Sequence, residues 1–108
     1  MDYVNGPSTG RIRHPLTSGN ATRVFTARTG GTNLIRLTSD RSNSHDIAIL
    51  FTDENEVPTA TDVLNFADYY LVGKDTYELE VQPKMNVYAT VPSGGTATLI
   101  AKEVYVQG

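Results

Sequence analysis

Apolar and polar residues alternate along most of the chain after residue 20, in short runs separated by turn residues. The clearest run is 76–81, where Tyr77, Leu79 and Val81 alternate with threonine and glutamate. Successive side chains of a β-strand point to opposite faces of the sheet, so this run predicts a strand with one buried and one solvated face. Further short strands are predicted over 22–29, 33–38, 46–52, 85–91, 96–101 and 104–106.

Three local departures from strict alternation add detail. Residues 47–51 (IAILF) are apolar at every position, which predicts a central strand covered on both faces or packed against a neighbouring chain. The sequence PSGG at 92–95 predicts a hairpin turn between two strands. Lys102 and Glu103 interrupt the last apolar run, which predicts a β-bulge or a change of sheet at that point.

The stretch 59–72 fits either a helix or a strand. Its apolar residues fall on one helical face behind an N-cap at Thr61 or Asp62. Its second half also has the composition of a strand. We therefore predict a short helical turn over 62–66 and a strand that begins at Asp68.

Seven or eight short strands in this space predict an all-β fold, a two-sheet antiparallel β-sandwich. A chain of 108 residues, 39% hydrophobic and 19% charged, supports one globular core. Residues 1–20 differ, because glycine and proline punctuate them and no strand or helix period persists. We therefore divide the chain into an extended N-terminal arm, 1–20, and a sandwich domain, 21–108. The arm is expected to become ordered only against something outside the domain.

Composition and charge exclude several classes of function. The chain has no cysteine, hence no disulfide and no cysteine nucleophile, and no apolar run long enough for a signal peptide or a membrane span. The net charge is −3, yet residues 1–45 hold six arginines against two acidic residues, and residues 46–108 hold three lysines against ten. The acidic total disfavours nucleic acid as a partner. The split indicates either charges interleaved on one surface or a basic arm that meets an acidic face.

No pattern of residues indicates catalysis or a metal site. Ser44, His45 and Asp46 are neighbours, but adjacent side chains of an extended segment point to opposite faces, so they cannot form a triad by themselves. The acidic run 53–56 could hold a cation, although it lacks the spacing of a calcium-binding loop and a solvated turn is commoner. The tyrosines from Tyr69 to Tyr105 lie in predicted strands without interleaved basic residues, which indicates core packing. We therefore predict no enzymatic activity, no cofactor, and no catalytic or metal-binding residue.

Three segments carry a distinctive order of strands: ATRVFTARTGGTNLIRLTSD, DIAILFTDENEVP and ADYYLVGKDTYELEVQPKMNVYATVPSGGTATLIAKEV. A threonine-rich start leads into a strand, and a second strand ends in a polar turn. A tyrosine-bearing strand, a TYEL strand and a hairpin with a glycine-rich tip then follow. In this order the chain resembles the small β-sandwich structural proteins of tailed bacteriophages, over about residues 21–106.

The resemblance implies a virion component on the capsid surface, a decoration or cement protein that binds the major capsid protein or another virion protein and stabilises the head shell. It implies a homo-oligomer, for example a trimer, whose extended arms clamp neighbouring subunits. The interface residues expected in the arm are Tyr3, Arg11, Ile12, Arg13, His14 and Leu16. Two alternatives stay open: a head–tail, neck or tail accessory protein, and a carbohydrate-binding module with Tyr69 or Tyr70 as its aromatic platform.

Overall fold

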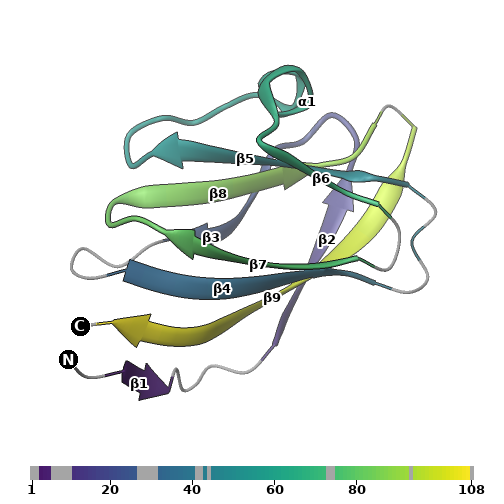
Figure 1. Cartoon of the computed structure of the whole chain (residues 1–108). Coiled ribbons are helices and arrows are strands. Elements are labelled where there is room, and N and C mark those ends of the chain that lie inside the picture. The colour runs from purple at the N-terminus through teal and green to yellow at the C-terminus, as the bar shows by residue number, and fades with distance from the viewer. Residues whose placement is uncertain are drawn as a thin grey trace.

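The chain folds into a β-sandwich of two antiparallel sheets, with one short helix on its outside (Figure 1). The computed structural model describes residues 3–5, 11–26, 32–40, 43, 45–72, 75–92 and 94–107. This architecture confirms the predicted fold class.

The five-stranded sheet is organised around its longest strand, β9 (Thr96–Gln107). On one side β9 pairs with β4 (Thr32–Ser39), and β4 pairs with β7 (Thr76–Val81). On its other side β9 pairs with two short strands in succession, β1 (Tyr3–Asn5) and β2 (Ile12–Thr17). The free edges of this sheet are therefore β7 on one side and β1 with β2 on the other.

The four-stranded sheet has the order β3-β8-β5-β6. Its strands are β3 (Thr22–Thr26), β8 (Met85–Thr90), β5 (Ile47–Asp53) and β6 (Tyr69–Leu71). Helix α1 (Ala60–Phe66) joins β5 to β6 and contacts β5 and β8 on the outer face of this sheet (Figure 1). Where the chain passes from one sheet to the other, the steps from β2 to β3 and from β6 to β7 join edge strands. The step from β8 to β9 also changes sheet, so the predicted hairpin between 85–91 and 96–101 is wrong: β8 pairs with β3 and β5, and β9 pairs with β1, β2 and β4.

The core lies between the sheets and is built from the inward-facing side chains of both. Its largest fully buried members include Leu16, Ile35, Leu37, Ile47, Ile49, Leu71 and Leu99. In β7, Leu79 and Val81 are buried while Glu78 and Glu80 are exposed, as the alternation predicts. Tyr77 was predicted to face inward with them, but it lies at the rim of the core and keeps 39% of its surface exposed.

Strand β5 is covered on both faces, which confirms the prediction from its unbroken apolar run. Ile47 and Ile49 face the core between the sheets. Ala48 and Leu50 face the other way and pack with Val63 of α1. The helix therefore explains why β5 lacks the polar alternation of the other strands.

Helix α1 begins with a reciprocal pair of hydrogen bonds at its N-terminus. The Asp62 N–H donates to the Thr59 hydroxyl at 3.1 Å, and the Thr59 N–H donates to the Asp62 carboxylate at 3.1 Å. This capping box satisfies two backbone donors that a helix start leaves unpaired. The predicted helical turn and following strand are confirmed, but the N-cap is Thr59 and not Thr61 or Asp62.

The interruption predicted near the end of the chain is a β-bulge in β9. Leu34 of β4 pairs with Tyr105, and the next residue, Ile35, pairs with Glu103. Val104 is therefore the extra residue of the bulge. The strand stays in the same sheet on both sides of it, so the alternative of a change of sheet does not apply.

The N-terminal region corrects the division of the chain into arm and domain. Residues 12–17, assigned to the arm, form β2 and pair with β9 along their whole length. Leu16 is 1% exposed and belongs to the core. Strands β3 to β9 correspond to the eight segments predicted from residue 21 on, because 96–101 and 104–106 form the single strand β9. Strands β1 and β2 are additional. Residues 1, 2 and 6–10 of the predicted arm lie outside the described residues.

Candidate interaction surfaces

The side chains predicted to contact a partner lie on β1, on β2 or just before β2, and they face different ways. Arg11, Ile12 and Arg13 are exposed, Ile12 over 49% of its surface, so a partner can reach them. Leu16 was also expected at the interface, but it is buried in the sandwich's own core and cannot contact a partner. Tyr3 lies in β1, and its side chain is outside the described residues.

His14 is half-buried on β2, between the exposed Arg13 and the proline that follows. Its Nε2 atom is buried and has no hydrogen-bond partner in the described part of the chain. Burial lowers the pKa of His14 below its ordinary value of 6.5, because a charged ring would lose hydration here. His14 is therefore a neutral histidine packed into the fold at neutral pH, and its burial makes it a poor docking contact.

The free edge of β2 is interrupted at Pro15. Thr98, the residue opposite Pro15, directs its backbone N–H and C=O to the β4 side, where they bond Asn43 and Asp40. In an antiparallel pair, two opposed residues both point their backbone groups toward the partner strand or both point them away from it. Because those of Thr98 point away from β2, those of Pro15 point away from β9, to the free edge. Proline has no N–H. An incoming strand would therefore meet a missing donor in the middle of β2.

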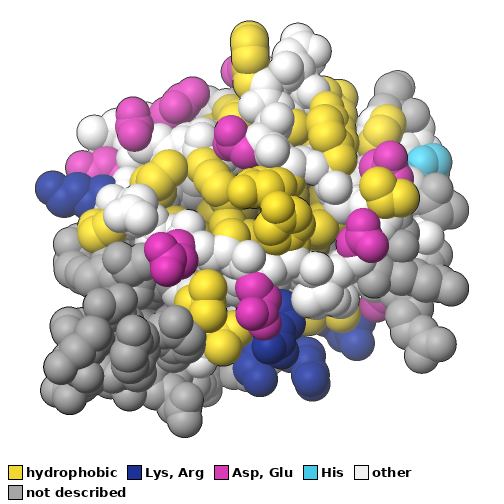
Figure 2. Space-filling model, viewed as in Figure 1, with side chains coloured by type: hydrophobic (Ala, Val, Ile, Leu, Met, Phe, Trp, Pro, Cys, Tyr) yellow, Lys and Arg dark blue, Asp and Glu magenta, His cyan; other side chains and the backbone are white. Residues whose placement is uncertain are grey.

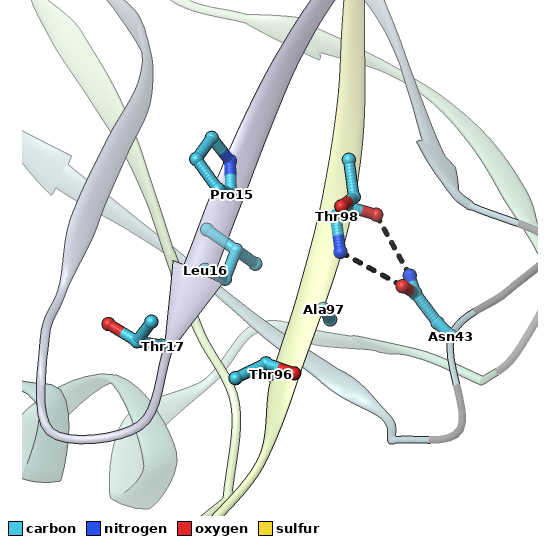
Figure 3. Close-up of a pocket in the computed structure, with 7 residues that line it drawn as sticks. All are labelled: Pro15, Leu16, Thr17, Asn43, Thr96, Ala97 and Thr98. Atoms are coloured by element: carbon cyan, nitrogen blue, oxygen red, sulfur yellow. Dashed lines mark hydrogen bonds between the residues drawn. The ribbon is translucent and has the colours of Figure 1, made fainter.

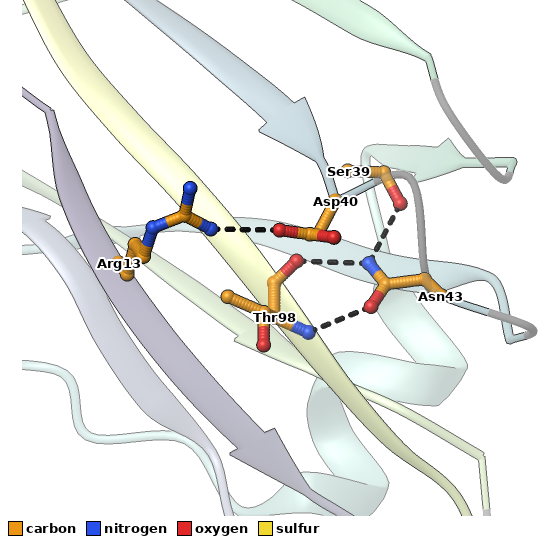
Figure 4. Close-up of polar contacts among 5 residues, drawn as sticks. All are labelled: Arg13, Ser39, Asp40, Asn43 and Thr98. Atoms are coloured by element: carbon orange, nitrogen blue, oxygen red, sulfur yellow. Dashed lines mark hydrogen bonds and ion pairs between the residues drawn. The ribbon is translucent and has the colours of Figure 1, made fainter.

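Polar side chains bind strand β9 to the segment that follows β4 (Figure 4). The Asn43 Nδ2 donates to the Thr98 carbonyl at 2.8 Å and to the Ser39 hydroxyl at 2.9 Å, and its Oδ1 accepts from the Thr98 N–H at 2.9 Å. Asn43 thus pairs with Thr98 as the next residue of a strand would. Arg13 of β2 forms an ion pair with Asp40 at 2.7 Å. These groups are occupied within the fold.

A shallow cavity of about 390 Å³ lies beside these contacts (Figure 3). It is lined by Pro15, Leu16, Thr17, Asn43, Thr96, Ala97 and Thr98. None of these side chains is titratable, and the polar atoms of Asn43 already bond Thr98 and Ser39. Apart from threonine hydroxyls, the cavity therefore offers no free polar side chain to orient a small ligand.

Strand β7 is the opposite free edge of the sheet, and it is unbroken. The Ser39 N–H donates to the Asp75 carbonyl at 2.9 Å just before the strand, so the odd-numbered residues of β7 point their backbone groups to β4. The residues that point their N–H and C=O to the open side are Thr76, Glu78 and Glu80. The β4–β7 pairing shows no register shift, and β7 contains no proline. A further strand could pair with this edge.

Aromatic side chains pack together at the side of the sandwich where the chain passes from β6 in one sheet to β7 in the other. The ring centroid of Tyr69 lies 5.8 Å from that of Phe51 and 4.4 Å from that of Tyr77, with both pairs tilted. The hydrogen bond with Tyr69 raises the pKa of Tyr77, with smaller contributions from burial and from the charge of Tyr69. The rim of the core at β7 is therefore aromatic and uncharged.

Exposed apolar side chains occur on the same side of the molecule. Phe66 at the end of α1, Tyr70 in β6 and Val72 after it expose 68%, 52% and 54% of their surfaces. Figure 2 shows hydrophobic side chains in the middle of this face, with acidic side chains around them. We call this face, with β6, β7 and the end of α1, the β6–β7 side. Its apolar centre and acidic surroundings make it the best candidate interaction surface of the described chain.

The residues considered for catalysis or metal binding do not form a site in the described part of the chain. No group of three or more histidine or acidic side chains there lies close enough to hold a metal ion. The acidic run 53–56 is an exposed turn, in which the Glu56 N–H donates to the Asp53 carbonyl. His45 is half-buried, and Ser44 lies outside the described residues. Among the described helices, none is long and apolar enough to cross a membrane.

Comparison with protein-family models gives no match, and comparison with curated proteins gives none either. The function of the chain is therefore argued from its own surfaces.

The sequence pattern did not indicate the β6–β7 side. It predicted that Glu78 and Glu80 face solvent, which is correct, but strand order decides which backbone edges are free. Phe66 gave one signal that could have been used. Phe66 is a large aromatic residue at the end of a short helix whose buried face is already supplied by Val63. A residue in this position indicates exposed apolar surface.

Proposed function

We propose that the chain is a non-enzymatic structural protein of a viral particle, a decoration or cement protein that binds the capsid surface and stabilises the head shell. The single observation that carries the protein-binding role is the β6–β7 side, where an unbroken free strand edge lies beside exposed apolar side chains. Such groupings mark interaction surfaces in proteins. The viral setting is supported by the resemblance of residues 21–106 to the small sandwich proteins of tailed bacteriophages.

In this proposal the sandwich is a rigid body, and many copies bind a repeating surface formed by the major capsid protein. Oligomers of the chain would engage several subunits at once, so modest contacts would add up to high avidity. Of the contacts predicted from the sequence, Leu16 is withdrawn because it belongs to the core, and His14 because it is half-buried, while Tyr3, Arg11, Ile12 and Arg13 remain predictions. Deleting residues 1–20 would not separate binding from folding, because it removes strand β2.

The test is reconstitution on particles. Purified chain is mixed with phage heads that lack it, the heads are sedimented, and the bound copies are counted by quantitative mass spectrometry. We expect saturable binding of hundreds of copies and greater resistance of the heads to heat. Chain that stays in the supernatant at every concentration would contradict the proposal.

The same count separates the shell from the neck or tail. A few copies or a dozen per particle would place the chain at the neck or tail instead of the shell. The geometry offers less to a carbohydrate, because Tyr69 and Tyr70 are adjacent on β6 and point to opposite faces. The Tyr70 hydroxyl also donates to the Leu64 carbonyl at 2.7 Å, so it is engaged within the fold.

A further inference from the structure

We propose that the free edge of β7 binds an extended segment of a partner protein in which apolar residues alternate with lysine or arginine. The segment pairs with β7 as an added strand of the five-stranded sheet. This inference rests on the proposed protein-binding role and specifies the surface that is used and the chemistry of what it takes.

The backbone of β7 is arranged for strand addition. Thr76, Glu78 and Glu80 direct their N–H and C=O groups away from β4, toward solvent. Proteins usually protect such an edge with a proline, a bulge, charged side chains or a covering loop. Strand β7 is the last strand of its sheet, and its own residues include no proline and show no register shift. The charges that it carries are acidic only, so they repel acidic strands but not a basic one, and extended peptides add to sheets at edges of this kind.

The solvent-facing side of β7 determines the charge of the partner. Glu78 is partly balanced by Arg36 of β4, whose Nε and Nη2 lie 2.7 Å and 2.6 Å from Glu78 Oε2. Glu80 lies one pleat further along, opposite the apolar Leu34. Asp75 precedes the strand and is exposed. Opposite charges attract across neighbouring strands, so the incoming segment carries basic side chains on this face.

The inner side of β7 determines the alternate residues of the partner. Leu79 points into the core, and Tyr77 lies at its rim, where it packs on Tyr69 of the other sheet with ring centroids 4.4 Å apart. A strand added to β7 places every second side chain beside these rings, at the opening between the sheets. Figure 2 shows hydrophobic side chains gathered there. Apolar side chains fit this position, because they cover exposed apolar surface.

A second copy of the chain fits this edge poorly. Two β7 strands paired antiparallel about a two-fold axis would, in the registers of greatest overlap, place Glu78 opposite Glu78 or opposite Glu80 of the other copy. The β2 edge, although basic, lacks a donor at Pro15. The occupant is therefore a segment of a different protein.

The probe is a short synthetic peptide of alternating valine and lysine, with a peptide of the same composition in block order as its control. Amide hydrogen exchange of the full chain is followed by NMR. We expect the alternating peptide to slow exchange of the Thr76, Glu78 and Glu80 amides about tenfold or more, because these N–H groups become hydrogen-bonded. Protection that is absent, or equal with the block peptide, overturns the inference.

Three substitutions at one position separate backbone pairing from charge. Glu80→Pro removes an N–H that points to solvent together with the carboxylate, so the fold is kept and protection by the peptide is lost. Glu80→Gln removes the charge alone and keeps the backbone N–H, so it weakens binding but does not abolish protection. Glu80→Lys weakens binding of the valine–lysine peptide about fivefold and improves binding of a valine–glutamate peptide. Glu56→Lys, in the exposed turn, is the matched control and leaves both affinities nearly unchanged. Thermal melting of each variant confirms folding, and a folded Glu80→Pro variant that still shows protection overturns the inference.

The particle assay keeps this inference separate from the proposed function. If wild-type chain binds heads and Glu80→Pro does not, both stand. If both bind heads equally, the virion role stands and the β7 edge is not the site. If neither binds heads while the peptide still protects β7, the edge is a peptide-binding site and the capsid role is wrong.

Discussion

On the outer face of the four-stranded sheet, Ala48, Leu50 and Tyr88 are buried beneath helix α1. The corresponding face of the five-stranded sheet is open to solvent, and its strands β4 and β7 are joined there by the Arg36–Glu78 ion pair and a 3.3 Å contact between the hydroxyls of Thr38 and Thr76. The two sheets share one core but differ in what lies beyond them.

The difference explains where a partner can bind. One broad face is already covered by the chain's own helix, and the other is solvated and carries the Arg36–Glu78 ion pair. Among the described residues, neither face has large exposed apolar surface in its middle. The capacity to bind therefore lies at the strand edges and at the rim around β6, where Tyr70 and Val72 are exposed.

The strongest way to break the contrast between the faces is to place a charge beneath the helix. Val63 is fully buried, so Val63→Asp should cost about 4 kcal/mol or more of the free energy of unfolding, or unfold the chain. Arg36→Ala on the open face should cost less than about 1 kcal/mol, since exposed ion pairs contribute little. Urea denaturation measures both, and equal losses would show that the faces do not differ as described.

The inner faces should, in contrast, respond alike. Leu16 and Leu71 lie in edge strands of different sheets, and each is 1% exposed. Replacing either by alanine should cost about 2–5 kcal/mol, because each change leaves a cavity in the shared core. A loss of under about 1 kcal/mol for Leu16→Ala alone, in the same denaturation experiment, would show that β2 is a detachable arm after all.

The contribution of the helix cap gives a finer comparison. Thr59→Ala removes the hydroxyl that accepts from Asp62 and should cost about 1 kcal/mol, measured as a shift of the urea midpoint. Thr38→Ala on the open face, which loses only a weak contact with Thr76, should change stability by less than about 0.5 kcal/mol. The reverse order of the two losses would contradict the role assigned to the helix.

The smallest effect expected is a dependence of stability on pH that originates on β2. His14 binds a proton less readily in the folded chain than in the unfolded chain, where its pKa is near 6.5. The unfolded state therefore holds more protons as the pH falls below that value, so this residue lowers the stability on acidification until the folded pKa is passed. Denaturation at about pH 7.5 and about pH 5 should show a smaller loss in His14→Gln than in wild type. An equal loss in both would remove this assignment.

Alternation was sufficient to predict the strands whose two faces differ. In β7, Leu79 is buried and Glu80 is exposed, as the alternation of apolar and polar residues predicted. The unbroken apolar run of β5 correctly predicted that both faces of this strand are covered. Strand β2 could not be predicted this way, because Pro15 occupies a free-edge position where its missing N–H does no harm, and Leu16 alone marks the buried face.

The β6–β7 side could not be predicted from the sequence, for a different reason. Whether Glu78 lies at an edge depends on β4, not on its own neighbours, since strand order is a property of long-range pairing. The expectation that the arm would bind rested on a region whose second half belongs to the sheet. Exposure of Phe66 and Tyr70 likewise depends on where the helix docks.

Strand β9 follows each of its partners, β1, β2 and β4, in the sequence. On the ribosome, β2 must therefore wait through most of the chain's synthesis before its hydrogen-bonding partner emerges. Until then Leu16, Ile35 and Leu37 have no completed sheet to pack within. Pairings so distant in sequence fold slowly and leave apolar surface exposed meanwhile, so the nascent chain is most open to misassembly just before its last strand is made.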